Sequence, residues 1–338
     1  MRMAIMGTGS LGTILGAYIS KAGHKIDLID PYKEHVEVLN KNGAKVIGLA
    51  DFTQAVTAIT PSQMEGIYDL VFYMTKQTYN EEAFKNLKPH VNDKSIIVTL
   101  QNGLPERAVV REFGEDRVMG CPVGWGATFK GPGLSELTSD INKAWFDLGR
   151  VDGKITPALD EVKKILDSMC NTIITDNLMG IRFSKLLANA TFSGMSASMA
   201  CPFVDVLENE KALTCVKYIG NECIKIAGAA KIKMEPFGEC YPQRDLVFTT
   251  IEEREALSQV YKDTWWPHRM NRASMLQDLE KGRKCEINAI NGVVCEMGDE
   301  YGIDTPLNDQ VVDVVSRIEQ GKLKVGNHLD LFRIPDKI

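Results

Sequence analysis

Lys185 and Asn189 stand four residues apart in a largely apolar stretch of the chain. If this stretch is helical, the two side chains project from one face. A lysine whose pKa is lowered toward neutrality can donate a proton to a carbonyl oxygen, and an amide one turn away can hold that oxygen. The pair therefore suggests proton donation to a carbonyl, although a solvated helix face is the plainer interpretation of the two residues alone.

A second polar group lies about ninety residues further along the chain. Ser274 and Asp278 are one helical turn apart, and Glu286 follows a glycine and an arginine at 282 and 283. We expect Ser274 to donate to a substrate carboxylate and Glu286 to orient the ammonium of Lys185 or to relay a proton. Asp278 is suited to pairing with a base. Exposed helix faces carry the same residue types, so this group indicates a functional site only in combination with the other motifs.

A glycine-rich turn near the N-terminus predicts a dinucleotide site. It follows an apolar run directly and reads Gly7, Thr8, Gly9, Ser10, Leu11, Gly12. Gly7 permits a tight turn, Gly9 lets a pyrophosphate approach the backbone, and Gly12 lets the next helix pack closely. The N-terminus of that helix favours an anion. FAD and S-adenosylmethionine folds use similar turns, so the turn alone does not name the chemistry.

Asp30 ends the second predicted strand, 18 residues beyond Gly12. A carboxylate there can accept hydrogen bonds from the adenosine ribose hydroxyls and would repel a 2′-phosphate. Lys33 and His35 follow Pro31, and we expect both to point outward. The sequence thus favours NAD(H), with NADP(H) as the alternative.

Polar residues also follow two later predicted strands. Lys76 and Asn102 stand just after the strands at 70–74 and 96–100. Because the carboxyl ends of strands face the ligand crevice in an open α/β sheet, we expect both residues to contact the cofactor. An ordinary turn at Asn102 and a solvated Lys76 are the alternatives.

The elements that must position these residues change in kind near residue 178. Short apolar runs alternate with helical periodicity before that point, which predicts an α/β Rossmann domain with a doubly wound, mainly parallel sheet over residues 1–178. The predicted strands are 3–6, 25–29, 45–47, 70–74, 96–100, 118–120, 144–148 and 172–175. The predicted helices are 11–22, 33–42, 80–87, 104–112 and 157–169. A glycine-rich run at 120–133 interrupts the pattern.

Residues 179–338 are predicted to form an all-α substrate-binding and catalytic domain. Apolar residues recur there at three- and four-residue spacings, over 180–199, 207–229, 270–279, 286–301 and 307–318. The segment 233–267 is expected to be an irregular excursion between helices. Its Trp265–Trp266 pair would suit a homodimer but does not require one.

The composition excludes several other classes of protein. The chain has 338 residues, 44% hydrophobic and 25% charged, and a net charge of -6, which argues against a disordered chain and against nucleic acid as a partner. We find neither a signal peptide nor a run of roughly 18 apolar residues, so we expect a cytoplasmic protein with no membrane partner. The eight cysteines lack metal-site spacing, so we expect them to be reduced and mostly buried, with no structural metal.

Taken in order, these motifs resemble the ketopantoate reductase family (2-dehydropantoate 2-reductase) over nearly the whole chain. The resemblance implies reduction of a small 2-oxo acid by NAD(P)H, with ketopantoate as the leading substrate. It implies that Lys185 is the general acid, that Glu286 assists catalysis and cofactor binding, and that Lys76, Asn102 and Ala127 contact the cofactor. The implied substrate-binding residues are Asn189, Ser193, Ser274 and Asp278.

The chain departs from the family pattern at two positions, one of them among the residues above. Ser193 and Phe203 stand where the family pattern has asparagines, so two amides are lost. A D-2-hydroxyacid dehydrogenase acting on a branched or aromatic acid is therefore the alternative. The Gly180, Lys185 and Asn189 spacing also resembles β-hydroxyacid dehydrogenases, although the block from Ser274 to Glu286 argues against that group. The alternative of another class is a sensor that binds NAD(H) without turnover.

Overall fold

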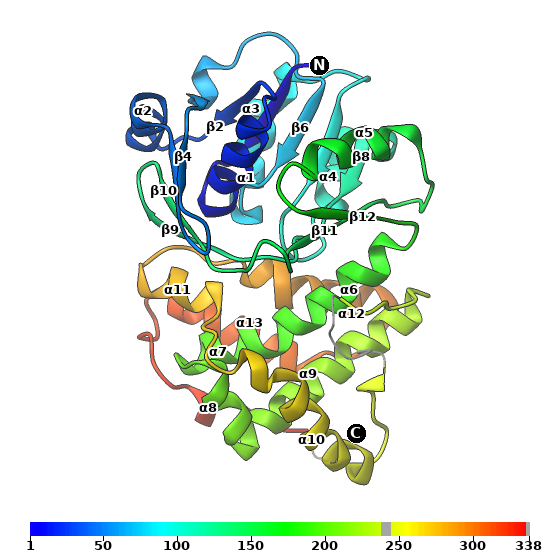
Figure 1. The fold of residues 1–338 in the computed structure, drawn as a ribbon. Coiled ribbons are helices and arrows are strands. Elements are labelled where there is room, and N and C mark those ends of the chain that lie inside the picture. The colour runs from blue at the N-terminus through cyan, green and yellow to red at the C-terminus, as the bar shows by residue number, and fades with distance from the viewer. Residues whose placement is uncertain (238–244, 336–338) are drawn as a thin grey trace. The chain divides into compact units, whose positions relative to one another are not determined.

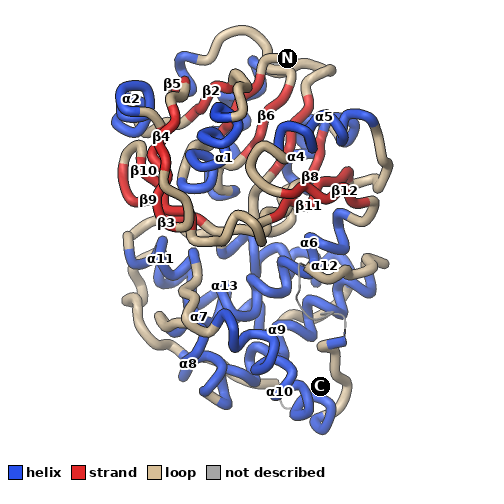
Figure 2. Tube along the Cα trace, in the orientation of Figure 1, coloured by secondary structure: helices blue, strands red, loops and turns tan. Residues whose placement is uncertain are grey.

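The chain folds into two compact units, Met1–Leu178 and Met179–Ile338. The computed structural model describes residues 1–237 and 245–335. The first unit contains both helices and strands, whereas the described residues of the second form helices and loops with no strand (Figure 2).

An eight-stranded sheet forms the centre of residues 1–178 (Figure 1). Its spatial order is β12 (Asn171–Thr175), β11 (Trp145–Arg150), β8 (Val118–Gly120), β7 (Ile96–Thr99), β6 (Leu70–Tyr73), β1 (Met3–Met6), β2 (Ile26–Ile29) and β5 (Thr57–Ile59). Neighbouring strands are parallel except for β8 and β11, which pair antiparallel. The strand order reverses direction at β1, between β2 and β6, as in a doubly wound fold, so the predicted fold class is confirmed.

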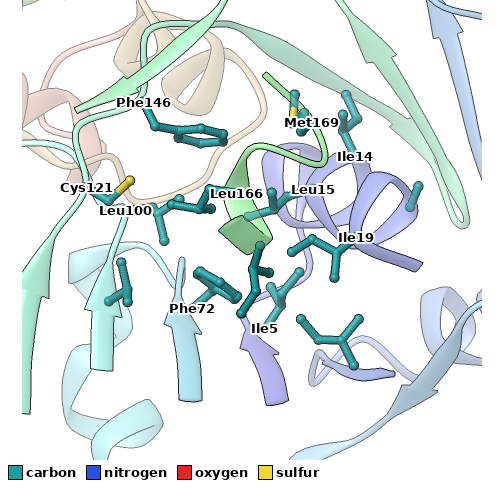
Figure 3. Packing of buried hydrophobic residues seen from close by; sticks show 14 of the residues in the cluster. Ile5, Ile14, Leu15, Ile19, Phe72, Leu100, Cys121, Phe146, Leu166 and Met169 are labelled. Carbon is teal, nitrogen blue, oxygen red and sulfur yellow. The ribbon is translucent and has the colours of Figure 1, made fainter. Parts of the chain in front are cut away.

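Helices cover both faces of this sheet because alternate residues of each buried strand point to opposite sides. Met3 and Ile5 of β1 belong to a core shared with α1 (Ser10–Lys21), α2 (Lys33–Asn42) and α5 (Pro157–Leu166), part of which is shown in Figure 3. Ala4 and Met6 face the other core, with α3 (Asn80–Leu87) and α4 (Glu106–Phe113). The strands therefore read as continuous apolar runs.

A second, four-stranded sheet corrects two of the predictions. Its order is β4 (Phe52–Gln54), β3 (Ala44–Gly48), β10 (Leu134–Leu137) and β9 (Ala127–Gly131). The strand predicted at 45–47 is β3 of this sheet, because β5 takes the place beside β2. The glycine-rich run at 120–133 also contains strand β9. Helix α1 packs between the two sheets (Figure 1).

The second unit is built from helices, as predicted, with two π-helical turns among them. Its α-helices in the described residues are α6 (Leu178–Ala188), α7 (Gly194–Met199), α8 (Phe203–Glu208), α9 (Glu210–Ala229), α10 (Ile251–Trp265), α11 (Ser274–Glu280), α12 (Val293–Tyr301) and α13 (Pro306–Glu319). The π turns are Asn189–Ser193, here called the first π turn, and Asn288–Gly292, the second π turn.

Short 3-10 turns join several helices and strands in both units. They span Pro61–Gln63, Gln77–Tyr79, Lys88–His90, Glu115–Arg117, Trp266–His268 and Leu329–Leu331.

Helix α10 shows that the prediction of an irregular excursion at 233–267 is wrong over fifteen of its residues. Thr250 and Glu253 form a capping box at its N-terminus. Leu257, Tyr261 and Trp265 then recur at four-residue spacing and are buried. Part of the same excursion, residues 238–244 with Cys240, lies outside the described residues.

Most of the cysteines and one tryptophan of the Trp265–Trp266 pair are buried. The seven cysteines in the described part of the chain are free thiols, and five of them are buried. Trp265 is 8% exposed, whereas Trp266 is 45% exposed, so only Trp266 of the suggested dimer pair lies at the surface. None of the described helices is both long enough and apolar enough to cross a membrane.

Candidate active site

The glycine-rich turn follows β1 and has a geometry that requires glycine. Gly7 has a φ of +96°, and a Cβ there would collide with the backbone nitrogen of Thr75. A Cβ at Gly12 would lie 2.6 Å from the carbonyl oxygen of Gly7. Gly7 is thus needed for its positive φ, and Gly12 for the close approach of α1 to the turn.

Gly9, between them, leaves open space above the N-terminus of α1. It is exposed and occupies the N-cap position, where no side chain accepts a hydrogen bond from the helix. A Cβ at Gly9 would meet no atom of the described residues within 4 Å. The first N–H groups of a helix lack partners within it and carry partial positive charge. Ser10 and Leu11 begin this helix, so the turn fits a pyrophosphate.

Thr8 faces the sheet. It is fully buried, and both its backbone N–H and its hydroxyl donate to the carbonyl oxygen of Ile29, each at 3.2 Å. Gly7 donates to the same oxygen at 2.9 Å. The turn after β1 is therefore fastened to the end of β2, which places Thr8 as a support of the turn.

Asp30 is the residue that follows this shared carbonyl. Its Oδ1 accepts the backbone N–H of Tyr32 at 3.0 Å, and its own N–H donates to Ile59 at 3.1 Å. Burial raises the pKa of Asp30, against the opposing effects of the Tyr32 N–H and of His35. A carboxylate beside the glycine turn is suited to accept ribose hydroxyls.

His35 corrects the expectation that both bases after Pro31 point outward. Its ring is 1% exposed, its Nε2 lies 2.8 Å from the carbonyl oxygen of Thr8, and its Nδ1 accepts the N–H of Gly133 at 2.8 Å. Because Nδ1 accepts, Nε2 carries the proton and donates to Thr8. Burial lowers the pKa of His35, which favours this neutral form. Lys33 is exposed, as expected.

Lys76 and Asn102 lie at the carboxyl ends of two adjacent parallel strands, β6 and β7. The side chain of Gln77 donates to the carbonyl oxygen of Asn102 at 2.6 Å, which joins the two loops. Thr75 Oγ1 donates to the Met6 carbonyl at 3.2 Å and so ties the loop after β6 to β1. Lys76 and Asn102 therefore lie at the carboxyl-terminal end of the strands, as do the glycine-rich turn after β1 and Asp30 after β2.

Ala127 reaches the same unit from the second sheet. It is the first residue of β9 and is half-buried. It packs against the core that contains α1. A cofactor contact there stays a prediction.

In the second unit, Lys185, Asn189 and Ser193 follow one another along a single helical path. Lys185 lies in α6, and Asn189 and Ser193 are the first and last residues of the first π turn. All three are half-buried, and Leu186 and Leu187 beside them are buried. Lys185 Nζ lies 5.5 Å from the centroid of the Phe237 ring, a cation–π arrangement.

Ser274, Asp278 and Glu286 come from the next part of this unit. Ser274 is the exposed first residue of α11, whereas Asp278 and Glu286 are 7% and 8% exposed. Helix α11 contacts α7 and the first π turn, and the first π turn contacts the second. The elements that carry Asn189, Ser193 and Ser274 are therefore packed together within the unit, and the second π turn, which begins two residues after Glu286, contacts the first.

Two residues that contact the predicted site residues or the glycine-rich turn, Phe237 and His35, were not predicted as site residues. Phe237 lies in a segment that is not periodic, so only its contact with Lys185 reveals it. His35 sits two residues before Glu37 on a helix whose polar residues are mostly exposed, and its buried position depends on Gly133, 98 residues away. A long-range backbone contact of this kind leaves no local signal in the sequence.

Phe203 belongs to an aromatic cluster in the core of the second unit. Its ring lies 5.5 Å from that of Phe192 and 6.0 Å from that of Trp265, and it is 6% exposed. Phe192 immediately precedes Ser193, so the cluster supports the last residues of the first π turn.

The fold and the site together define a class of proteins. A Rossmann unit with a dinucleotide turn, followed by a helical unit that carries a half-buried lysine, is the architecture of nicotinamide-dependent oxidoreductases with a helical second domain.

Family comparison narrows this class. A model described as ketopantoate reductase PanE/ApbA matches residues 3–153, and one described as its C-terminal part matches residues 177–319. The chain belongs to the ketopantoate reductase family, so the resemblance seen in its motifs is confirmed.

Individual relatives agree with this assignment. The chain is 26% identical to a 2-dehydropantoate 2-reductase of Pyrococcus abyssi over 91% of this chain and 94% of the relative. It is 25% identical to one of Streptococcus pyogenes, over 93% and 97%.

Solved structures share the fold. D-mandelate dehydrogenase in a ternary complex with NADH and anilino(oxo)acetate superposes with a TM-score of 0.80 and 23% identity, over 95% of this chain and 99% of that one. A ketopantoate reductase of Ralstonia eutropha JMP134 gives 0.79 and 24%, over the same shares.

Proposed function

We propose that the protein reduces a small 2-oxo acid to the corresponding 2-hydroxy acid, with ketopantoate as the leading candidate substrate and pantoate as its product. The observation that carries the proposal is the match of both parts of the ketopantoate reductase family model, over residues 3–153 and 177–319. The curated relatives that match over more than nine-tenths of the chain bear the name 2-dehydropantoate 2-reductase.

The first unit would hold the cofactor. The open space at Gly9 and the uncapped N-terminus of α1 suit a pyrophosphate, and Asp30 suits the ribose hydroxyls. Lys76, Asn102 and Ala127 are the further proposed contacts. A bound NADH or NADPH supplies the hydride that reduces the keto carbon.

The second unit would supply the proton. Hydride addition turns the keto oxygen into an alkoxide, and Lys185 Nζ would give a proton to that oxygen to complete the hydroxyl group. Overall, one 2-oxo acid, one reduced dinucleotide and one proton yield one 2-hydroxy acid and one oxidised dinucleotide. Lys185 would regain its proton from water.

Polar groups near this lysine would bind and orient the substrate. Asn189 and Ser193 border Lys185 along the helical path, and Ser274 would donate to the substrate carboxylate. Glu286 is 8% exposed, and a buried carboxylate is suited to hold an ammonium group in place. Asp278 is proposed to stabilise the same substrate-binding surface.

The coenzyme is proposed to be NADH. Support comes from Asp30, whose carboxylate would repel a 2′-phosphate while accepting ribose hydroxyls. The D-mandelate dehydrogenase that shares this fold is described in complex with NADH. NADPH is the alternative coenzyme.

A branched or aromatic 2-oxo acid is the second candidate substrate. Two observations favour it: the loss of amides at Ser193 and Phe203, and the similarity in fold to a dehydrogenase crystallised with anilino(oxo)acetate. A less polar site would accept a less polar acyl side chain.

Steady-state rates with a panel of acids test the proposal. The purified protein is assayed with ketopantoate, with branched and aromatic 2-oxo acids and with a 3-oxo acid, each with NADH and with NADPH. The largest kcat/KM with ketopantoate and NADH is expected. A larger value with a bulkier 2-oxo acid would select the second candidate. Tight NADH binding without turnover of any acid would contradict the proposal and indicate a sensor.

A further inference from the structure

Each of the two π turns begins close behind a proposed catalytic residue. The first starts at Asn189, four residues after Lys185, and the second starts at Asn288, two residues after Glu286. π turns are rare and are frequently found at functional sites. Because both π turns lie next to proposed catalytic residues, the contacts that stabilise these turns bear on the geometry of the site.

The first π turn leaves one backbone carbonyl without its helical partner. In a continuous α-helix the N–H of Gly194 would donate to the carbonyl of Ala190. Here that N–H donates to the carbonyl of Asn189, five residues back, and to that of Thr191. Ala190 is fully buried, so water does not reach its carbonyl readily.

Asn291, from the second π turn, supplies the missing donor. Its Nδ2 lies 3.0 Å from the carbonyl oxygen of Ala190, 101 residues away in the sequence. Asn291 is itself fully buried. The bond therefore joins the segment after Lys185 to the segment after Glu286.

The orientation of this amide is set by a buried chain of hydrogen bonds. The other N–H of Asn291 Nδ2 donates to Asn308 Oδ1 at 2.9 Å, and Asn308 Nδ2 donates to Glu222 Oε2 at 2.6 Å. Glu222 also accepts the backbone N–H groups of Leu307 and Asn308, both at 3.0 Å. Because Asn308 presents its oxygen to Asn291, the nitrogen of Asn291 must face Ala190.

Gly194 makes room for this contact. A Cβ at Gly194 would lie 2.9 Å from Asn291 Oδ1 and 2.9 Å from Val311 Cγ1. Within the described residues, Oδ1 of Asn291 is buried and has no hydrogen-bond partner. An apolar residue would avoid that unsatisfied oxygen but would lose the two donor bonds that the amide makes.

We propose that Asn291 is a positioning residue: by donating to the Ala190 carbonyl it holds the first π turn in place, and so sets the directions of Asn189 and Ser193 relative to Lys185. Loss of this donor would remove a buried hydrogen bond from the Ala190 carbonyl, and the turn would reorganise toward α-helical bonding. That change of register would rotate Ser193 about the helix axis relative to Lys185. The consequence for catalysis rests on the function proposed above.

Two variants and a control test the proposal. Asn291→Leu has a similar volume and removes both donors, whereas Gly194→Ala keeps the amide and pushes it away from the turn. Ile226→Ala, at a buried position of α9, is the control for general loss of stability in the same unit. For each protein, backbone hydrogen–deuterium exchange of the peptide 186–195 is measured together with kcat, the KM for the 2-oxo acid and the Kd for NADH.

The expected result is local. Asn291→Leu and Gly194→Ala should speed exchange in 186–195 by about 10-fold and lower kcat/KM for the acid by about 10-fold, while the Kd for NADH changes less than about 2-fold. Ile226→Ala should change neither exchange in this peptide nor kcat/KM.

The outcomes separate the two proposals. Unchanged exchange in the two variants, or changed exchange with wild-type kcat/KM, would overturn the positioning role. If the wild-type protein reduces no 2-oxo acid, the proposed function fails, and the exchange measurement alone then supports or overturns the role of Asn291 in the turn.

Discussion

His35 Nε2 lies 2.8 Å from the carbonyl oxygen of Thr8, so a buried histidine on α2 supports the glycine-rich turn directly. The same ring accepts the N–H of Gly133 and thereby connects the turn to the hairpin of the second sheet. The glycine-rich turn is thus supported by β2, by the loop after β6 and by this histidine.

Replacing His35 with leucine should weaken both the fold and NADH binding. The N–H of Gly133 would lose its partner and the Thr8 carbonyl would keep only the hydroxyl of Thr13, which is expected to lower the free energy of unfolding by about 1–3 kcal/mol. A shift of the turn should raise the Kd for NADH by about 10-fold, equivalent to about 1.4 kcal/mol. Urea denaturation and NADH fluorescence titration measure the two effects, and unchanged affinity in a folded variant would show that the histidine does not support the site.

His35 also predicts a dependence of stability on pH. Its pKa is lowered in the folded protein, so below the ordinary value of 6.5 the unfolded chain binds a proton that the folded chain resists. This contribution is present above pH 6.5 and is lost as the pH falls below it. The free energy of unfolding of wild type relative to His35→Leu should therefore decrease from pH 7 to pH 5, and a constant difference would contradict this.

Glycine variants distinguish space for a ligand from space needed by the fold. Gly9→Ala should fold with nearly wild-type stability, because no atom lies within 4 Å of the new methyl group, but should raise the Kd for NADH at least about 10-fold. Gly12→Ala should instead lower stability by about 1–3 kcal/mol, since its Cβ would lie 2.6 Å from the Gly7 carbonyl.

The control for both is Gly228→Ala in α9, where a Cβ also meets no atom within 4 Å. It should raise stability by about 0.5–1 kcal/mol and leave NADH binding unchanged. Thermal denaturation and NADH titration compare the three proteins. If Gly9→Ala bound NADH with wild-type affinity, the assignment of the turn as the pyrophosphate site would be contradicted.

Asp30 is expected to set the choice of coenzyme. Asp30→Ala removes the charge that would repel a 2′-phosphate, so the ratio of kcat/KM for NADH to that for NADPH should fall at least about 10-fold. Glu37→Ala removes an exposed charge from α2 and should leave the ratio unchanged. An unchanged ratio in Asp30→Ala would mean that another residue selects the coenzyme.

Glu222 should make the second unit less stable as the pH rises. Burial raises its pKa to about 7 from the ordinary 4.5, against the opposing hydrogen bonds from Leu307 and Asn308. Stabilisation by the protonated form is present below pH 4.5 and is lost as the pH rises through about 7. The free energy of unfolding of wild type relative to Glu222→Gln should fall by about 3 kcal/mol between pH 4.5 and pH 8. A rise over this range would show that the ionised carboxylate is the stabilised form.

The fold was predictable where hydrophobic patterns are long and locally bounded. The buried strands β1 and β6 each consist of four apolar residues beside a turn signal, and helices α2 and α3 begin and end where their periodicity does. Strand β5 has only three residues, so its place beside β2, and with it the displacement of β3 to a second sheet, depends on tertiary packing. Helix α10 was detectable from its capping box at Thr250.

The candidate site was predictable only in part. In the turn from Gly7 to Gly12, the positive φ of Gly7 and the close approach at Gly12 both require glycine, so the conformation can be inferred from the sequence. By contrast, the support of that turn by His35 and the bond between Asn291 and Ala190 join residues 27 and 101 positions apart. No pattern along the chain encodes such contacts, and the two π turns likewise appear only in three dimensions.

Turnover by Lys185→Ala tests the central claim most directly, because the proposed chemistry needs the proton of this amine. With the best acid and saturating NADH, kcat should fall by about 100-fold or more, while the Kd for NADH stays at the wild-type value. Lys225→Ala, at an exposed position of α9, is the matched control and should keep full activity. A Lys185→Ala protein that retains kcat within about 3-fold of wild type would contradict the assignment of Lys185 as the proton donor.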